Sequence, residues 1–396
     1  MNDESRSALL PSSFLLPPSS FHIVHLTSVH PPLDNRIFFK ECRSLAEAGY
    51  NVTLVAPHEQ TELIDGVRIR GVPLNRFRWS RVTKTMIAVY AAAVDENADV
   101  YHLHDPELIG VGMLLKLRGK RVVYDVHEDL PRQVRSKDWI PRCLRPIVAG
   151  CASLAEAAFG RVANGIVAAT PTIARRFPTK KTCTVRNFPR VSHNRPVQFR
   201  PYNQCEPLVI HASAEISTAR GAVEMVRAIG LVSEHLNARL MLIGHVHDPA
   251  LQTKISSMPE WSRVDWLGWK PAREVPTLLH QARIGLNLLH DFPNYRDALP
   301  TKMYEYMSAG IPIIASDFPQ WRELYEDIGC TLFVDPNNVQ EIADAIQWLL
   351  RHPTEAEALG RRGRRAVETT LNWKSEEQKL LRMYRQLIAA PQKDVA

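Results

Sequence analysis

Short apolar runs alternate with segments of helical periodicity along the chain after residue 20. The apolar runs predict strands, and the periodic segments between them predict helices. Nearly continuous apolar strands that are each followed by a helix are typical of a parallel sheet covered on both faces, and right-handed crossovers make such a domain doubly wound. In the first half the predicted strands are 22–29, 51–57, 67–73, 100–105, 121–127, 165–170 and 182–187, and the predicted helices are 37–49, 83–94, 108–117 and 144–163.

The alternation stops in a polar, proline-rich stretch and then resumes, which predicts a linker between two domains of similar construction. A helical stripe near the C-terminus, formed by Leu380, Leu381, Tyr384 and Leu387, indicates one more helix. In the second half the predicted strands are 208–213, 239–244, 264–269, 284–289, 312–316 and 331–335, and the predicted helices are 221–236, 275–282 and 339–350.

These patterns divide the chain into five segments. The first is expected to be a disordered leader, because prolines interrupt its apolar run and Asp3 and Glu4 precede that run, unlike in a signal peptide. No window is apolar over the length that a membrane span requires. The segments are the leader 1–20, the N-terminal domain 21–188, the linker 189–207, the C-terminal domain 208–372 and the final helix 373–390.

Composition and charge limit the kind of protein this is. The chain has 396 residues, 45% hydrophobic and 23% charged, as in an ordinary globular protein. Its six cysteines form no C-x-x-C pair, so neither a zinc motif nor a disulfide framework is indicated, and a reducing cytoplasm fits. The net charge is +10 over residues 1–200 and −3 over 201–396. A basic half indicates a phosphorylated substrate, an anionic membrane surface, nucleic acid or simply a solvated basic face. Nucleic acid is the weaker reading, because no nucleic-acid-binding motif accompanies the charge.

The segment 291–317, DFPNYRDALPTKMYEYMSAGIPIIASD, contains the main candidate residues. A predicted strand leads into a charged loop, Pro300 opens a short helix, and Gly310 ends it. Asp297 lies in the loop and Glu305 lies eight positions later, inside the helix. Both carboxylates are therefore expected at the carboxyl end of a parallel strand, which is the edge where open α/β sheets bind ligands.

Asp297 and Glu305, together with the segment PTKMYEYMSAGIPIIASDFPQWRE, resemble the acid-x7-acid element of retaining glycosyltransferases of family four, in a bacterial surface-polysaccharide branch. The resemblance implies the GT-B fold: two doubly wound Rossmann-like domains that face each other across a cleft, with a last helix returning to the first domain. It also implies that Asp297 touches the hydroxyls of the donor sugar and that Glu305 holds the ribose of the nucleotide. The family usually has Glu at the first position, so Asp297 is one methylene shorter.

Further donor-binding residues follow from the same resemblance. Arg220 and Gly221 lie between a strand and a helix, where backbone N–H groups and the helix dipole favour a diphosphate. The family has an arginine five residues before this basic position, whereas this chain has Glu215. We expect Lys302, which follows Thr301 at the start of the next helix, to supply the missing charge. Trp269 and Lys270 are expected beside the nucleobase. The indole ring either stacks on the base or, as we favour, packs against the protein, and residues 267–270 contact the base through their backbone.

In the N-terminal domain, His127 ends a predicted strand in the segment YDVHEDLP, and the family has a histidine near the reaction centre at the matching place. His104 and Asp105 end the preceding strand and point to the same edge, so both are candidates for holding the acceptor. Arg36 follows the first strand and either meets an acceptor phosphate or is solvated. Read alone, a single histidine at a strand end is more often structural.

No two Asp residues stand two apart, so no D-x-D metal motif is present, and neither a metal ion nor another cofactor is expected. Arg220, Lys302 and helix N-termini are expected to meet the charge of the diphosphate. The favoured function is a hexosyl-transferring enzyme that moves sugar from a nucleotide-diphosphate sugar to a glycan or polyprenyl-diphosphate-linked acceptor, in the cytoplasm or at the inner membrane face. Two alternatives remain: a nucleotide-sugar epimerase with the same fold, and a non-catalytic nucleotide-sugar-binding protein.

Overall fold

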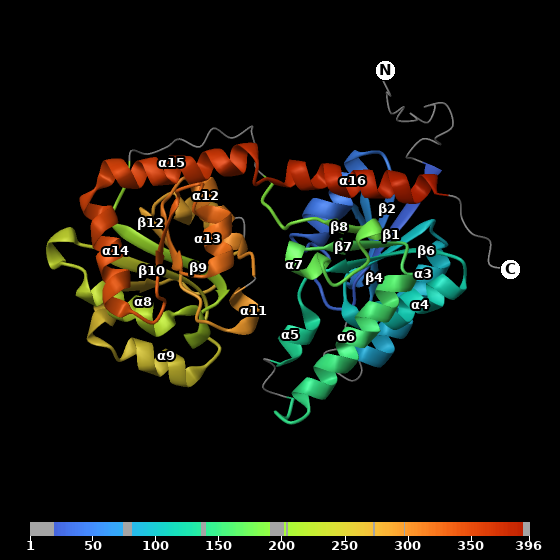
Figure 1. Ribbon diagram of the computed structural model, residues 1–396, viewed down its shortest axis with the longest axis horizontal. Coiled ribbons are helices and arrows are strands. Elements are labelled where there is room, and N and C mark those ends of the chain that lie inside the picture. Colours follow the sequence, from blue (N-terminus) through green and yellow to red (C-terminus); the bar gives the residue numbers. More distant parts are fainter. Residues whose placement is uncertain are drawn as a thin grey trace, which may run out of the picture. The chain divides into compact units, whose positions relative to one another are not determined.

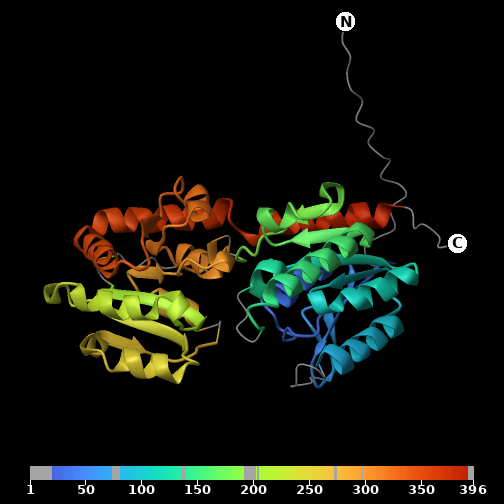
Figure 2. The same ribbon diagram turned by 60° about the horizontal axis from the view of Figure 1, so that its bottom comes forward.

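The computed structural model describes residues 20–73, 81–135, 140–190, 202, 205–271, 274–296 and 298–390. The chain divides into two compact units. Unit 1 comprises Met1–Arg186 and Glu377–Ala396, and unit 2 comprises Asn187–Glu376. Each unit is a Rossmann-like α/β domain with its own sheet and with helices on both sides of that sheet (Figures 1 and 2). The predicted leader, apart from Ser20, and most of the predicted linker lie outside the described residues.

The sheet of unit 1 has the strand order β3-β4-β2-β1-β5-β6-β7-β8. All its neighbouring strands pair in parallel except β3 and β4, which form an antiparallel hairpin. The strand order reverses between β1 and β5, so the loops that follow these two strands lead to opposite faces of the sheet. The strands are β1 His22–Leu26, β2 Asn51–Pro57, β3 Glu62–Ile64, β4 Val67–Val72, β5 Val100–Leu103, β6 Arg121–Val126, β7 Gly165–Ala168 and β8 Thr182–Thr184.

Helices of unit 1 follow the predicted pattern, except that two of them, 37–49 and 83–94, begin as π-helices. The predicted helix 37–49 begins as a π-helix, η2, and becomes α-helical only at Arg43. The last helix of the chain, α16 (Trp373–Ala389), lies over the sheet of unit 1 (Figure 1). The other helices are α1 Arg43–Glu47, η3 Arg81–Thr85, α3 Met86–Glu96, η4 Pro106–Leu108, α4 Ile109–Leu117, α5 Leu130–Arg135, α6 Arg145–Val162, α7 Pro171–Ala174 and η5 Thr179–Lys181; η2 is Ile37–Cys42.

The sheet of unit 2 has the order β11-β10-β9-β12-β13-β14, and all its pairs are parallel. Successive residues of β9 belong to different cores: Val209 packs with one buried cluster and Ile210 with the other. This period of two is what a sheet covered on both faces requires. The strands are β9 Leu208–Glu215, β10 Arg239–His245, β11 Val264–Trp266, β12 Ile284–Asn287, β13 Ile313–Ser316 and β14 Thr331–Val334.

Unit 2 contains one long helix that the pattern did not predict, α15 (Pro353–Thr369). Its buried face is formed largely by Ala356, Gly360 and Gly363, which give almost no apolar signal. A Cβ on Gly360 would lie 2.0 Å from the carbonyl oxygen of Gly310, so glycine there permits close backbone contact. The other helices are η7 Thr218–Arg220, α8 Ala222–Leu231, η8 Glu234–Leu236, α9 Pro249–Ser256, η9 Pro259–Arg263, α10 Val275–Leu279, α11 Pro293–Arg296, α12 Thr301–Ala309, α13 Pro319–Tyr325 and α14 Val339–Arg351.

Within the described ranges, none of the helices combines the length and the apolar character that crossing a bilayer would demand.

Candidate functional site

In unit 2 the strand order reverses between β9 and β12, and the loops after these strands meet at the carboxyl edge of the sheet. The loop after β9 leads through η7 to α8, and the loop after β12 leads to α12. His290 N donates a hydrogen bond of 2.9 Å to Ala219 O, which ties the two loops together. A crevice at such a reversal is where doubly wound sheets bind nucleotides.

Gly221 caps α8 in the left-handed conformation, with φ +71°. A Cβ at this position would lie 2.7 Å from the carbonyl oxygen of Leu288, in the loop after β12. Glycine therefore satisfies two requirements here: a positive φ and the close approach of two backbone segments. Ala222 N donates to Ser217 O at 3.3 Å, but no side chain caps the first turn of α8 within the described part of the chain. The next N–H groups of that turn can therefore bind an anion.

Replacing Gly221 by Ala is expected to destabilise unit 2 more than the same change at Gly268. Gly268 has nearly the same φ, +68°, but a Cβ there meets nothing within 4 Å. The Gly268→Ala protein therefore pays only the left-handed penalty, of about 1 kcal/mol. Gly221→Ala adds a clash with a backbone atom and should cost roughly 2 kcal/mol more. Thermal unfolding of both variants measures the difference; equal midpoints would show that the Leu288 contact has no energetic weight.

Two cations belong to this crevice, one from each loop. Arg220 ends η7, and Lys302 lies in the first turn of α12. Burial and the nearby Arg220 lower the pKa of Lys302 to about 7, and Glu305 opposes them only in part. Among the described residues, neither Lys302 Nζ nor Arg220 Nε has a hydrogen-bond partner. Two cations that repel each other while keeping unused donors form a site prepared for an anion.

The other predicted donor residues occupy varied positions. Asp297 lies outside the described residues, so its distance from Glu305 stays a prediction. Glu305 is half-buried in α12, and Thr301 is exposed at the start of that helix. Trp269 keeps 49% of its surface exposed while its ring stacks on His245, with centroids 6.0 Å apart. Lys270 is half-buried, and Glu215 is exposed at the end of β9.

Sequence reasoning missed two buried polar residues beside this crevice. His211 lies within β9, and burial and the charge of Lys302 lower its pKa well below the ordinary value. Asn287 ends β12, fully buried, and its amide atoms accept and donate no hydrogen bond to any residue that the structure describes. The signal was a single polar residue in each apolar strand, LVIHASA and IGLN.

In unit 1 the predicted residues gather at the carboxyl edge of β1, β5 and β6. His127 Nε2 donates to Asp125 Oδ2 at 2.6 Å, and His104 Nδ1 lies 3.2 Å from the same oxygen. Arg36 donates to both carboxylate oxygens of Asp125, at 3.2 and 2.9 Å, and to Val185 O at 3.0 Å. Burial alone would raise the pKa of Asp125, but Arg36 and the two histidines hold it well below its usual range.

These contacts correct one expectation and refine another. Arg36 is not solvated: its guanidinium is buried and bound to Asp125, so it fixes the carboxylate that orients His127. Asp105 Oδ2 accepts hydrogen bonds from Thr27 Oγ1 at 2.8 Å and from Ser28 N at 2.6 Å, and so holds the loop after β1. The acceptor-binding roles of Arg36, His104 and Asp105 stay predictions.

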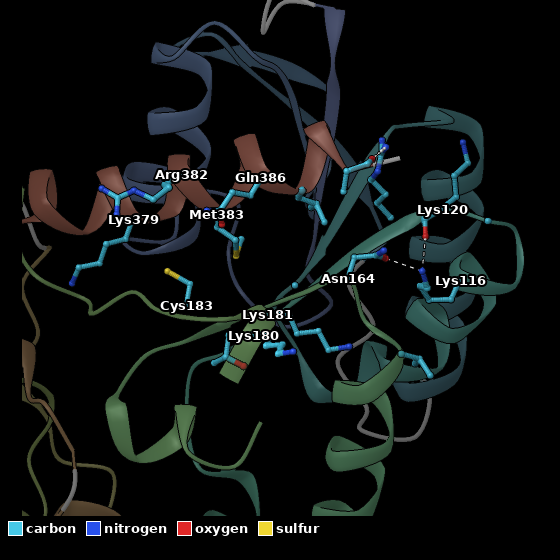
Figure 3. Close-up of a pocket in the computed structure, with 17 residues that line it drawn as sticks. Lys116, Lys120, Asn164, Lys180, Lys181, Cys183, Lys379, Arg382, Met383 and Gln386 are labelled. Atoms are coloured by element: carbon cyan, nitrogen blue, oxygen red, sulfur yellow. Dashed lines mark hydrogen bonds between the residues drawn. The ribbon is translucent and has the colours of Figure 1, made fainter. Parts of the chain in front are cut away.

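A separate pocket of about 750 Å³ lies at the opposite edge of the same sheet, where β6, β7 and β8 begin and α16 passes (Figure 3). Its labelled side chains are mostly basic, and several bind backbone or amide oxygens. Lys116 Nζ donates to Asn164 Oδ1 at 2.8 Å, and Lys181 Nζ donates to Ala163 O at 2.7 Å. The lysines thus satisfy groups where helices end, and they also leave this edge of unit 1 positively charged.

Comparison with known proteins agrees with this geometry. Residues 36–187 match the family model described as glycosyl transferase 4-like domain, and residues 197–366 match the model described as glycosyl transferases group 1. No curated protein gives a significant sequence match.

Three solved structures illustrate the shared fold. Sucrose-phosphate synthase from Thermosynechococcus elongatus is 19% identical, with a TM-score of 0.74, over 94% of this chain and 100% of that one. HepE of Anabaena in complex with UDP and glucose is 12% identical, with a TM-score of 0.69, over 92% and 100%. A UDP-forming α,α-trehalose-phosphate synthase from Burkholderia xenovorans is 14% identical, with a TM-score of 0.64, over 93% and 99%.

The fold is that of an α/β protein with two Rossmann-like domains. The two family models cover most of both domains, and the chain is therefore a glycosyltransferase of the GT-B type.

Proposed function

We propose that this glycosyltransferase moves a sugar, with retention of anomeric configuration, from a nucleotide-diphosphate donor to a glycan or polyprenyl-diphosphate-linked acceptor in polysaccharide assembly. One observation carries the donor part of the proposal. Arg220 and Lys302 bring two cations with unused donor atoms to the carboxyl edge of the sheet in unit 2, within the described residues. Support also comes from HepE, which has been solved with UDP and with UDP-glucose.

The leaving diphosphate gains negative charge in the transition state, so cations fixed in advance at that place lower the barrier. Arg220, Lys302 and the first-turn N–H groups of α8 and α12 would serve that purpose, with Gly221 allowing the close backbone approach. The proposed reaction needs no metal ion at the diphosphate. Activity should therefore persist in EDTA, and strict dependence on a divalent ion would contradict this point.

Glu305 would accept hydrogen bonds from the ribose hydroxyls, and Asp297 would contact the donor sugar. Trp269, Lys270 and Thr301 would line the nucleotide. In unit 1, His127 would face the reaction centre, and Asp125 fixes its ring by the hydrogen bond at Nε2. His104, Asp105 and Arg36 would support the acceptor side. The departing phosphate would take the acceptor proton in a same-face attack, because none of the residues that the structure describes is an evident covalent nucleophile.

Basic side chains gather at the edge of unit 1 where β6, β7 and β8 begin. They support the proposal that the protein binds peripherally to the cytoplasmic face of an anionic membrane. A lipid-linked acceptor would be presented at that surface.

A panel of nucleotide sugars with a polyprenyl-diphosphate glycan tests the proposal. Transfer with an α-linked product from an α-linked donor, read by NMR of the anomeric proton, would support a retaining transferase. Conversion of donor alone would indicate the epimerase. Binding of UDP with no turnover on any acceptor would indicate a binding protein, the reading that Glu215 and Asp297 motivate.

Affinity for UDP should depend on pH through Lys302. Its pKa is about 7 in the free protein, and a bound diphosphate raises it. Below pH 7 the lysine is charged in both the free and the UDP-bound protein, so Lys302 adds no pH dependence to the Kd there. Above pH 7 binding must take up a proton, and the Kd should rise by up to about tenfold per pH unit. The terminal phosphate of UDP, with a pKa of about 6, is already ionised in this range. Calorimetry in buffers of different ionisation enthalpy measures the proton uptake; no uptake at pH 8 would contradict the assignment.

A further inference from the structure

Four side chains from separate parts of unit 1 converge in the interior. His25 lies on β1, Glu41 on η2, His102 on β5 and His104 just after β5. One nitrogen or oxygen atom from each lies within 4.8 Å of those of the others. His25 and His102 are register partners on adjacent strands, and their ring centroids are 4.6 Å apart. The strand register therefore places two imidazoles on one face of the sheet, and η2 brings a carboxylate against them.

The unsatisfied polar atoms of this cluster are concentrated in one place. His25 Nε2, His102 Nε2 and both carboxylate oxygens of Glu41 are buried and take part in no hydrogen bond among the residues that the structure describes. Arg36 Nε lies 3.0 Å from Glu41 Oε1 as an ion pair, but its hydrogen bonds go to Asp125 and Val185. Glu41 Oε1 thus has a charged neighbour. A buried polar atom without a partner costs roughly 1–3 kcal/mol, so His25 Nε2, His102 Nε2 and Glu41 Oε2 together call for a missing partner.

The hydrogen-bond network decides which ring nitrogens carry lone pairs. Asp125 is paired with the guanidinium of Arg36 and acts as an acceptor, so His104 Nδ1–H donates to it, at 3.2 Å. The other nitrogen, His104 Nε2, therefore accepts from His25 Nδ1–H, at 2.8 Å. His25 Nε2 is then left with a lone pair and no hydrogen-bond donor among the described residues. His102 Nδ1 lies 2.8 Å from the hydroxyl of Tyr384. When Nδ1–H donates a hydrogen bond to this hydroxyl, His102 Nε2 carries the lone pair.

We propose that His25 Nε2, His102 Nε2 and the carboxylate of Glu41 bind a divalent transition-metal ion of the zinc class inside unit 1, as a structural cross-link between β1, β5 and η2. Imidazole nitrogens select such ions over Mg²⁺ or Ca²⁺, which prefer oxygen ligands. Two imidazoles and one carboxylate are an accepted zinc ligand set, with a fourth position for water. His104 and Tyr384 bind the opposite nitrogens of the two ligands, as orienting groups around metal sites do.

The carboxyl groups of Glu41 and Asp125 both pair with the guanidinium of Arg36, at 3.0 and 2.9 Å. The π-helical turn fits a metal site, because such turns occur frequently at functional sites. This ion is distinct from any ion at the diphosphate, since all its ligands belong to unit 1.

Metal analysis of the full-length protein tests the proposal. Because the ligands are buried, the ion must enter during folding, so the protein is expressed with zinc and also refolded with Co²⁺. About one equivalent of zinc per chain is expected by mass spectrometry after dialysis. The Co²⁺ form should show visible d–d bands without thiolate charge-transfer bands. Less than a tenth of an equivalent would overturn the proposal and leave an internal water as the partner; thiolate bands would overturn it in favour of the cysteines.

Variants locate the ion. His25→Asn and His102→Asn should each lose most of the metal, whereas His58→Asn, a half-buried histidine of unit 1 outside the cluster, should keep it. Zinc should raise the unfolding temperature of the refolded wild type and of His58→Asn but not of the two cluster variants. Retention of one equivalent by both cluster variants would overturn the assignment. If neither variant folds, X-ray absorption of the wild-type zinc shell decides, and any sulfur ligand excludes the site.

Discussion

Replacing Lys302 by Met is expected to weaken UDP binding and, at the same time, to stabilise the free protein. The ammonium group is fully buried and its pKa is lowered to about 7, so keeping it charged at neutral pH costs roughly 4 kcal/mol. Methionine removes that cost while preserving the apolar stem. The unfolding temperature should therefore rise by about 5–10 °C. The Kd for UDP should rise by about 10–100-fold, because a charge-assisted hydrogen bond is lost.

The sign of the stability effect can be checked with pH. The folded pKa of Lys302 lies below the unfolded value of 10.5, so the unfolded state binds more protons between pH 7 and 10.5. The stability of the wild type rises with pH through this window, and the advantage of Lys302→Met shrinks with it. Lys254→Met, an exposed change on α9 of the same unit, should alter neither the unfolding temperature nor the Kd for UDP. A Lys302→Met protein that is less stable, or that binds UDP normally, would contradict the assignment.

Replacing Asp125 by Asn is expected to destabilise unit 1 by about 3–5 kcal/mol. The change leaves the buried guanidinium of Arg36 without its carboxylate and removes the ionised acceptor of His104 and His127. The matched control is Asp95→Asn. Asp95 also pairs with an arginine, Arg70, at 2.8 Å, but its side chain is 65% exposed, so its loss should cost about 0–1 kcal/mol.

Thermal unfolding and hydrogen exchange of the β1 and β6 amides measure both changes. If Asp125→Asn is too unstable to purify, the double variant Arg36→Met with Asp125→Asn tests whether the unpaired charge of Arg36 causes the instability. Removing the orphaned charge should recover part of the loss, because an unpaired buried charge is worse than none. Equal costs for Asp125→Asn and Asp95→Asn would show that the buried pair has no special weight.

Strand positions were predicted well because they rest on a local property. The strand 51–57 was predicted with the bounds that the structure has, since apolar and β-branched residues fill it and polar residues flank it. Strands that end at a site, such as 121–127 and 264–269, stop earlier than predicted. Their last residues turn to bind neighbours, as His127 does with Asp125. Tertiary hydrogen bonds outweigh the local preference there.

The candidate site was predicted in part for a similar reason. Arg220 and Lys302 could be found because each follows an apolar strand and opens a helix, and strand order places such loops together. The depressed pKa of Lys302 could not be found, because it depends on burial and on the distant Arg220. Arg36 was expected to face the acceptor or solvent. Asp125, 89 positions away, draws it inward instead.

By itself, the sequence determined that two doubly wound domains form and which strand ends carry charged side chains, because hydrophobic periodicity and helix-start signals are encoded within a few residues. The tertiary structure alone decided which of those side chains lose their water and which partners they find there. Burial and ion pairing depend on residues far apart in the chain, as the histidines at 25, 102 and 104 and the carboxyls at 41 and 125 demonstrate.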